Sequence, residues 1–112
     1  MTRDELFAYH QSMSFLALEL MKKKNRDYGA DTDPFRNFRG YGAFGILVRL
    51  SDKLSRTQTF LEKGTLAVEE ERIEDTLRDA LNYVVLLSAY LEDEKEKKEG
   101  PRCANCSCPS PS

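Results

Sequence analysis

The stretch from Val68 to Leu91 most constrains the fold of this 112-residue chain, because its apolar residues recur with the period of an α-helix. Acidic residues around Glu70 are where the helix dipole favours them, so the helix is predicted to begin between Val68 and Glu70. Its main apolar face is predicted to contain Ile73, Leu77, Ala80, Val84, Leu87 and Leu91. A second face carries Asp75, Asp79 and Asn82 and continues into Leu86. Because the second half is apolar nearly all round, these carboxylates are expected to face a pocket or a dimer interface.

Two more helices are predicted ahead of this one. The first begins at a capping box, with Thr2 as N-cap and Glu5 reaching back to its amide, and continues to about Lys24. The second is expected from about Phe44 to Lys63 and ends at Gly64, a residue suited to a left-handed C-terminal position. Residues 29–42 break the helical period but contain Phe35, Phe38 and Tyr41. A solvated linker would not carry three aromatic residues, so a packed functional loop with room for one short extra turn is predicted.

The chain is therefore predicted to be all-α, a bundle of three main helices forming a single domain over residues 1–99. Three helices leave apolar surface uncovered, so a homodimer that completes a four-helix-like core is expected. Residues 100–112 are rich in Pro, Ser and Cys and are predicted to be a disordered tail. The tail contains all three cysteines, Cys103, Cys106 and Cys108, and no fourth ligand for a structural zinc ion lies nearby in sequence.

Composition and charge exclude several classes of protein. A formal net charge of -2 argues against general binding of duplex DNA, although a local cluster of basic residues around one small anion is compatible with it. No apolar run reaches the length of a membrane span, and the N-terminus has no apolar signal region. Cysteines are confined to the tail rather than spread as a disulfide framework, which predicts a reducing, cytoplasmic location.

Asp75 and Asp79 are the first candidate site. Carboxylates four residues apart on one helix face lie close enough to share a divalent ion, and Mg²⁺ prefers such hard oxygen ligands. Asn82, one turn further, is a candidate to supply a carbonyl oxygen or to hold a water molecule. The alternative is a solvated acidic face whose salt-bridge partners are Arg72 and Arg78.

The second candidate site is the segment Arg49-x-x-Asp52-Lys53-x-x-Arg56. In one interpretation Asp52 joins the metal site while Arg49, Lys53 and Arg56 neutralise phosphate oxygens. In the other, Asp52 pairs with both arginines in a salt-bridge ladder within one helix. The spacing alone does not separate these two interpretations.

The end of the first helix and the following loop mix amides, charges and aromatic rings. Lys24 is a further candidate for phosphate binding. The residues predicted to recognise a base or a sugar are Asn25, Asp27, Tyr28 and Asn37. Helix capping and a packed turn also explain such a composition without any ligand.

Four segments in this order resemble the nucleotide modification associated domain 1 family of phages and bacteria, over about residues 10 to 92. They are Lys24-Asn25-x-Asp27-Tyr28-Gly29, Asp33-Pro34-Phe35-x-Asn37-Phe38, Gly45-Ile46-Leu47-x-Arg49-x-x-Asp52-Lys53-x-x-Arg56 and Glu74-Asp75-Thr76-Leu77-x-Asp79-x-x-Asn82-Tyr83. The resemblance implies a role in nucleotide metabolism or DNA-base modification. The helix-borne acids are also similar to those of the all-α MazG-like nucleotide pyrophosphohydrolases, which hold Mg²⁺ on helix carboxylates in dimeric four-helix cores.

The leading hypothesis is a metal-dependent nucleotide-binding protein that hydrolyses a ribo- or deoxynucleoside triphosphate to monophosphate and pyrophosphate. Asp52, Asp75 and Asp79 are its expected catalytic and metal-binding residues, with Mg²⁺ or Mn²⁺ as the ion. The alternative is a non-catalytic accessory module that binds a modified nucleotide or a partner enzyme. A purely structural helical adaptor ranks last, because it leaves the polar motifs unexplained.

Overall fold

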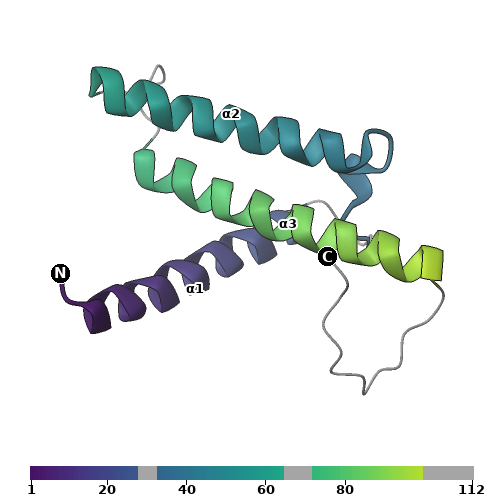
Figure 1. Ribbon diagram of the computed structural model, residues 1–112, viewed down its shortest axis with the longest axis horizontal. Helices are drawn as coiled ribbons and strands as arrows, with labels where there is room; N and C mark the ends of the chain where they lie inside the picture. The colour runs from purple at the N-terminus through teal and green to yellow at the C-terminus, as the bar shows by residue number, and fades with distance from the viewer. Residues whose placement is uncertain (28–32, 65–71, 100–112) are drawn as a thin grey trace.

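The computed structural model describes residues 1–27, 33–64 and 72–99. In order along the chain it contains α1 (Arg3–Asp27), the 3-10 helix η1 (Arg36–Phe38), α2 (Gly42–Lys63) and α3 (Ile73–Glu99) (Figure 1). These described ranges contain helices and turns but no strand. The prediction of an all-α chain with three main helices is confirmed.

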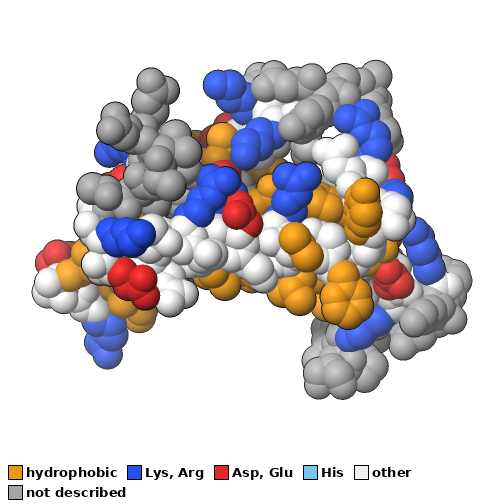
Figure 2. Space-filling model, turned by 90° about the horizontal axis from the view of Figure 1, so that it is seen from above, with side chains coloured by type: hydrophobic (Ala, Val, Ile, Leu, Met, Phe, Trp, Pro, Cys, Tyr) orange, Lys and Arg blue, Asp and Glu red, His pale blue; other side chains and the backbone are white. Residues whose placement is uncertain are grey.

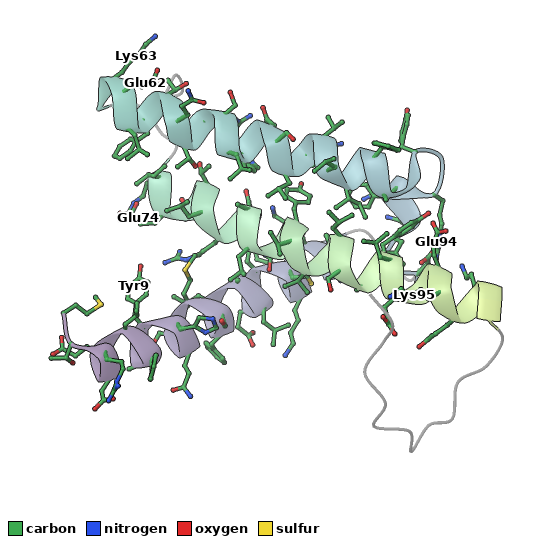
Figure 3. All side chains as sticks on the ribbon, in the orientation of Figure 1. Tyr9, Glu62, Lys63, Glu74, Glu94 and Lys95 are labelled. Carbon is green, nitrogen blue, oxygen red and sulfur yellow. The ribbon has the colours of Figure 1, made fainter. Side chains whose placement is uncertain are left out.

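Helix α3 lies between the other two long helices (Figure 1). It is antiparallel to α2, so Glu62 and Lys63 at the end of α2 lie at the same end of the molecule as Glu74 in the first turn of α3 (Figure 3). Among the described helices, α1 packs on α3 and not on α2. The N-terminal half of α1 extends beyond this contact, and every residue up to Ser12 is exposed. The fold is therefore a tight α2–α3 hairpin with α1 attached to one side.

The helix boundaries follow local signals. The Glu5 N–H donates to Thr2 Oγ1 at 3.1 Å, which confirms Thr2 as the N-cap of α1. At the end of α2, Gly64 has φ 79° and its N–H donates to the Phe60 carbonyl, which confirms the predicted left-handed cap. Helix α3 continues through Leu91 and along the charged run that follows it to Glu99, whereas its predicted start at residues 68–70 lies outside the described residues.

The loop before α2 carries part of the core, as predicted. Phe35 is buried edge-on against Tyr90 of α3, with ring centroids 5.3 Å apart, and Ile46 completes this cluster. The η1 turn is the short extra turn that the loop was expected to contain. The Asp33 carboxylate fixes the loop by accepting two hydrogen bonds from the Arg39 guanidinium, both at 2.8 Å. The prediction is wrong for Tyr41, a residue that is 77% exposed.

The packed face of α3 differs from the predicted one. Ala80 and Leu87 pack inward as expected, but Leu77, Val84 and Leu91 are exposed to solvent over about 39%, 50% and 49% of their surface. The buried stripe instead includes Thr76 and Tyr90. Small side chains let two helices approach closely, so Thr76 and Ala80 are suited to a close helix contact. Leu77 and Leu91, which were predicted to be buried, each directly follow a residue that is buried, Thr76 and Tyr90. The buried face of α3 is therefore rotated by about one residue from the face predicted by hydrophobicity.

Considerable apolar surface stays open in the described part of the chain. The exposed residues include Leu6, Phe7, Phe15 and Leu18 on α1, Phe44, Leu47, Val48, Leu54 and Leu61 on α2, and Leu77, Val84, Val85 and Leu91 on α3. Figure 2, which looks onto α2 from outside, shows apolar side chains gathered beside a group of lysines and arginines. Within the described ranges, no helix carries an apolar stretch long enough to cross a membrane.

Candidate functional site

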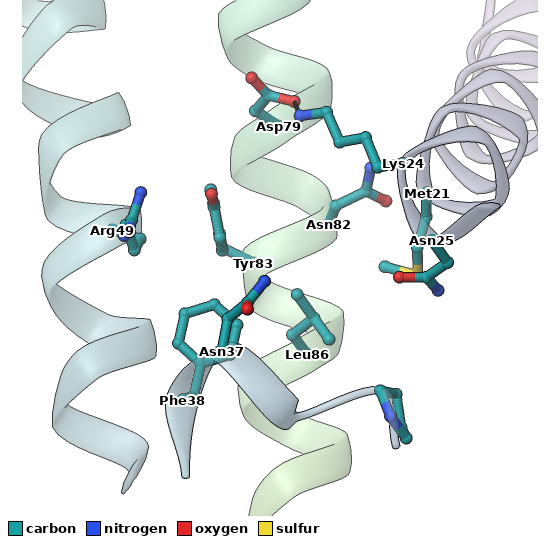
Figure 4. Close-up of a pocket in the computed structure, with 11 residues that line it drawn as sticks. Met21, Lys24, Asn25, Asn37, Phe38, Arg49, Asp79, Asn82, Tyr83 and Leu86 are labelled. Carbon is teal, nitrogen blue, oxygen red and sulfur yellow. Dashed lines mark hydrogen bonds and ion pairs between the residues drawn. The ribbon is translucent and has the colours of Figure 1, made fainter. Parts of the chain in front are cut away.

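A pocket of about 200 Å³ lies over α3, with α1 on one side and α2 on the other (Figure 4). Its floor comes from α3, and the loop with η1 closes one end. Six residues predicted from the sequence line it: Lys24, Asn25, Asn37, Arg49, Asp79 and Asn82. The fold therefore brings together polar residues from three helices and one loop.

Asp79 is the electrostatic centre of this site. Its Oδ1 accepts from the Lys24 ammonium of α1 at 3.1 Å, and its Oδ2 pairs with the Lys53 ammonium of α2 at 3.2 Å. The side chains of Asp79 and Lys53 are only 17% and 15% exposed, whereas that of Lys24 is 48% exposed. One carboxylate thus joins all three helices, and its two ion pairs are shielded to different degrees.

Arg49 adds a third cation on the α2 side of the pocket. Its side chain is exposed, and among the described residues no acid or other polar group pairs with it. Lys24 and Lys53 pair with Asp79, so with Arg49 on the opposite wall there are three positive charges and one carboxylate at or beside the pocket. Such a surplus favours an anionic ligand, because guanidinium and ammonium groups bind phosphate and carboxylate oxygens.

Amides and aromatic rings form the rest of the wall. Asn25 and Asn37 are exposed at the pocket, and each offers both a donor and an acceptor. Phe38 and Tyr83 stand edge-to-face, with centroids 6.5 Å apart. The Asn82 amide has a structural partner, since its Nδ2 donates to the Ala17 carbonyl of α1 at 3.0 Å. Asn82 therefore holds α1 against α3 at the position where the sequence predicts a ligand contact.

Asp52 and Asp75 do not join Asp79. The side chain of Asp52 is 54% exposed and pairs with Arg56 at 3.3 Å, and that of Asp75 is 57% exposed and pairs with Arg78 at 3.4 Å. Neither acid lines the pocket, and Arg56 does not line it either. Successive helical residues point about 100° apart, so with Lys53 turned toward α3 its neighbour Asp52 points outward. Asp52, Asp75 and Asp79 therefore do not form one cluster of carboxylates in this structure. The ion pairs Asp52–Arg56 and Asp75–Arg78 are instead of the kind that the alternative interpretation of each motif predicts.

The donors around Asp79 do not fit a divalent ion in this arrangement. Mg²⁺ and Mn²⁺ are commonly held by one or two carboxylates whose oxygens are available to the ion, together with water and phosphate oxygens. Both oxygens of Asp79 already face ammonium groups. A dication bound there would be repelled by both lysines at close range.

Five further residues complete the lining of the site, and none of them was predicted to contact a ligand. Met21, Pro34, Phe38, Tyr83 and Leu86 also line the pocket. Leu86 lies on the predicted second face of this helix, and Tyr83 follows Asp79 by four residues, so the helical period identifies both. The predicted contact residue Tyr28 and the side chain of Asp27 lie outside the described residues.

Comparisons of the chain with protein-family models, with curated proteins and with solved structures give no match. The resemblance to the nucleotide modification associated domain 1 family thus rests on its four motifs. Each motif contributes to the pocket: the first through Lys24 and Asn25, the second through Asn37, the third through Arg49 and the fourth through Asp79.

Proposed function

We propose that this chain is a nucleotide-binding protein of nucleotide metabolism or DNA-base modification, and that the nucleotide binds in the pocket over α3. The observation that supports this most is a local surplus of positive charge on a chain whose net charge is -2. Nucleotides carry their charge on phosphates, which basic side chains recognise. The meeting of four separate motifs at one pocket is the expected geometry of a ligand site.

The roles of the residues follow from their chemistry. Arg49 and Lys24, on opposite sides of the pocket, are proposed to bind phosphate oxygens. Asn25 and Asn37 are proposed to bind the edge of a base or the sugar, with Phe38 and Tyr83 as an apolar wall. A cavity of about 200 Å³ is smaller than the roughly 300 Å³ at which drug-sized ligand pockets begin, so it encloses only part of a nucleotide.

Hydrolysis of a nucleoside triphosphate to monophosphate and pyrophosphate is the second candidate. It is suggested by the spacing of Asp75 and Asp79 in the sequence and by the resemblance to helical pyrophosphohydrolases, although Asp75 pairs with Arg78 outside the pocket. Because the described donors do not fit Mg²⁺ or Mn²⁺, no reaction step is assigned to these carboxylates. A phage or bacterial cytoplasmic setting and a homodimer belong to the same proposal.

A nucleotide screen tests the proposal. The purified chain is heated with ribo- and deoxynucleoside mono- and triphosphates, including modified pyrimidines, in the presence of Mg²⁺, Mn²⁺ or EDTA. We expect at least one nucleotide to raise the melting temperature, and Arg49→Gln to remove this rise without changing the helical signal in circular dichroism. Lys22→Gln is the matched control, since Lys22 lies on α1 outside the pocket and pairs with Glu19.

The same samples are assayed for release of pyrophosphate. Release that is lost in Asp79→Ala identifies a pyrophosphohydrolase, whereas binding without release identifies the non-catalytic module. If no nucleotide changes the melting temperature and none is turned over, the nucleotide-binding proposal is wrong.

A further inference from the structure

Asp79 is held by two lysines in a way that determines what else it can bind. Lys53 has a side chain that is 15% exposed, and Asp79 is the only partner of its ammonium among the residues that the structure describes. Removing such a shielded ammonium from water is costly unless a carboxylate balances it. The charge of Asp79 is therefore already committed to Lys53.

Lys24 occupies the other oxygen of the same carboxylate but differs in its surroundings. Its side chain lines the pocket and is 48% exposed, and its ammonium has three N–H donors, of which Asp79 takes one. Two donors thus stay available at the rim of the pocket. Asp79 fixes the direction of the lysine, and Figure 4 shows Lys24 reaching from α1 across to this carboxylate.

Arg49 faces this arrangement from α2, without an acidic partner in the described chain. Its planar guanidinium can donate two parallel hydrogen bonds to one phosphate. Lys53, which does not line the pocket, thus balances the charge of Asp79. Lys24 and Arg49 do line the pocket, and both can donate hydrogen bonds to an anion there. In enzymes that use Mg²⁺, the ion commonly neutralises phosphate oxygens; here two side chains of the chain itself are placed to do so.

From these contacts we infer that the site binds the phosphate group of its nucleotide without a divalent metal ion, through Lys24 and Arg49, while Asp79 serves as the counter-ion of Lys24 and Lys53. The inference rests on the proposed nucleotide binding and goes beyond it by replacing the expected metal with protein cations. Asp79 is then a positioning residue and not a metal ligand.

Titration calorimetry with deoxynucleoside 5′-monophosphates, in EDTA and again in MgCl₂, tests the inference directly. The full chain is used, and the corresponding nucleosides without phosphate serve as reference ligands. We expect the Kd in EDTA to be within about twofold of that in MgCl₂. Lys24→Gln and Arg49→Gln should each weaken monophosphate binding about tenfold or more, as loss of one charge-assisted hydrogen bond does, with little effect on nucleoside binding.

Asp75→Asn and Lys22→Gln separate this inference from a metal site and from general electrostatics. Asp75 lies one turn before Asp79 and pairs with Arg78, so its substitution removes a potential metal ligand but no phosphate contact. We expect both variants to bind like the unaltered chain. Asp79→Asn should keep binding in EDTA, with a change of less than about tenfold, because it removes negative charge from the pocket. Its circular dichroism spectrum shows whether it is folded, and Lys24→Gln and Arg49→Gln test the inference independently of it.

Each other result has a definite meaning. Binding that appears only with MgCl₂ and is lost in Asp75→Asn or Asp79→Asn overturns the inference and leaves the nucleotide-binding proposal standing. Equal binding of nucleosides and monophosphates also overturns it, because the phosphate would then make no contact. Absence of binding by any nucleotide, with and without the metal, refutes the proposed function itself and the inference with it.

Discussion

Substitution of Asp79 by asparagine probes the centre of the fold as well as the site. The change keeps the shape of the side chain but removes its charge, so the shielded Lys53 ammonium loses its only carboxylate in the described chain. Breaking a fully buried ion pair costs about 3–5 kcal/mol, and breaking an exposed one costs about 0–1 kcal/mol. With Asp79 and Lys53 at 17% and 15% exposure, the pair lies between these limits and nearer to the buried one. Since the carbonyl oxygen of the introduced amide would still accept one hydrogen bond, we expect a loss of about 2 kcal/mol in the free energy of unfolding.

Urea unfolding followed by circular dichroism measures this loss. For a domain of this size, about 2 kcal/mol corresponds to a fall of roughly 8–16 °C in melting temperature. Asp75→Asn is the control, because its pair with Arg78 is exposed and within one helix, and we expect a change below about 0.5 kcal/mol. Equal losses in the two variants, or a loss below about 0.5 kcal/mol in Asp79→Asn, would refute the assignment of Asp79 as a shielded counter-ion.

Three further predictions concern the rest of the molecule. Gly45→Ala should lower the free energy of unfolding by about 1–2 kcal/mol in urea, because the added methyl group would lie 2.7 Å from Tyr41 Cβ; a gain, as helix propensity alone would give, would contradict this. The Arg39 guanidinium and the Phe35 N–H lower the pKa of Asp33 from 3.8 to about 2, so its stabilisation is present above about pH 4 and is lost as the pH falls toward 2; melting temperatures of the unaltered chain and Asp33→Asn should converge over that range, and a constant difference would argue against it. Sedimentation equilibrium should show a homodimer that Leu54→Lys weakens, since Leu54 is exposed on α2; a monomeric mass of the unaltered chain at micromolar concentration would count against the dimer.

The elements that could be predicted from the sequence are those set by neighbours along the chain. Thr2 and Gly64 act through hydrogen bonds to residues three or four positions away, so their spacing identified the helix ends. The exposed salt bridges Asp52–Arg56 and Asp75–Arg78 are equally local. Which side of α3 becomes buried is not a local property, because it depends on where α2 approaches. For this reason the apolar Leu77 is exposed and the polar Thr76 is buried, the opposite of what hydrophobicity alone predicts.

The site shows the same division. Lys24 and Asp79 are 55 residues apart in sequence, and no helical period relates them. The motif residues that meet at the pocket could be identified as candidates, but the lysine partners of Asp79 could not. From the sequence alone, Asp79 is therefore a candidate metal ligand, as the sequence analysis predicts. Charges on separate helices become partners only when the helices pack. The packing of α2 on α3 brings Lys53 to Asp79, so this carboxylate takes part in an ion pair that its own helix does not predict.

The attachment of α1 gives a last consequence for ligand binding. In the described chain α1 packs on α3 and not on α2, and two of its links to α3, Asn82 to the Ala17 carbonyl and Lys24 to Asp79, involve residues that line the pocket. A phosphate held by Lys24 and Arg49 would connect α1 to α2, so binding should stabilise the docking of α1 more than the α2–α3 hairpin. Hydrogen exchange would then slow most for amides between Ala17 and Lys24, by up to about 100-fold when the ligand exceeds its Kd about 100-fold, and less for amides around Ile46 in α2. Equal slowing in both regions would show that α1 and the hairpin open together, and slowing confined to the hairpin would show that the ligand does not contact α1.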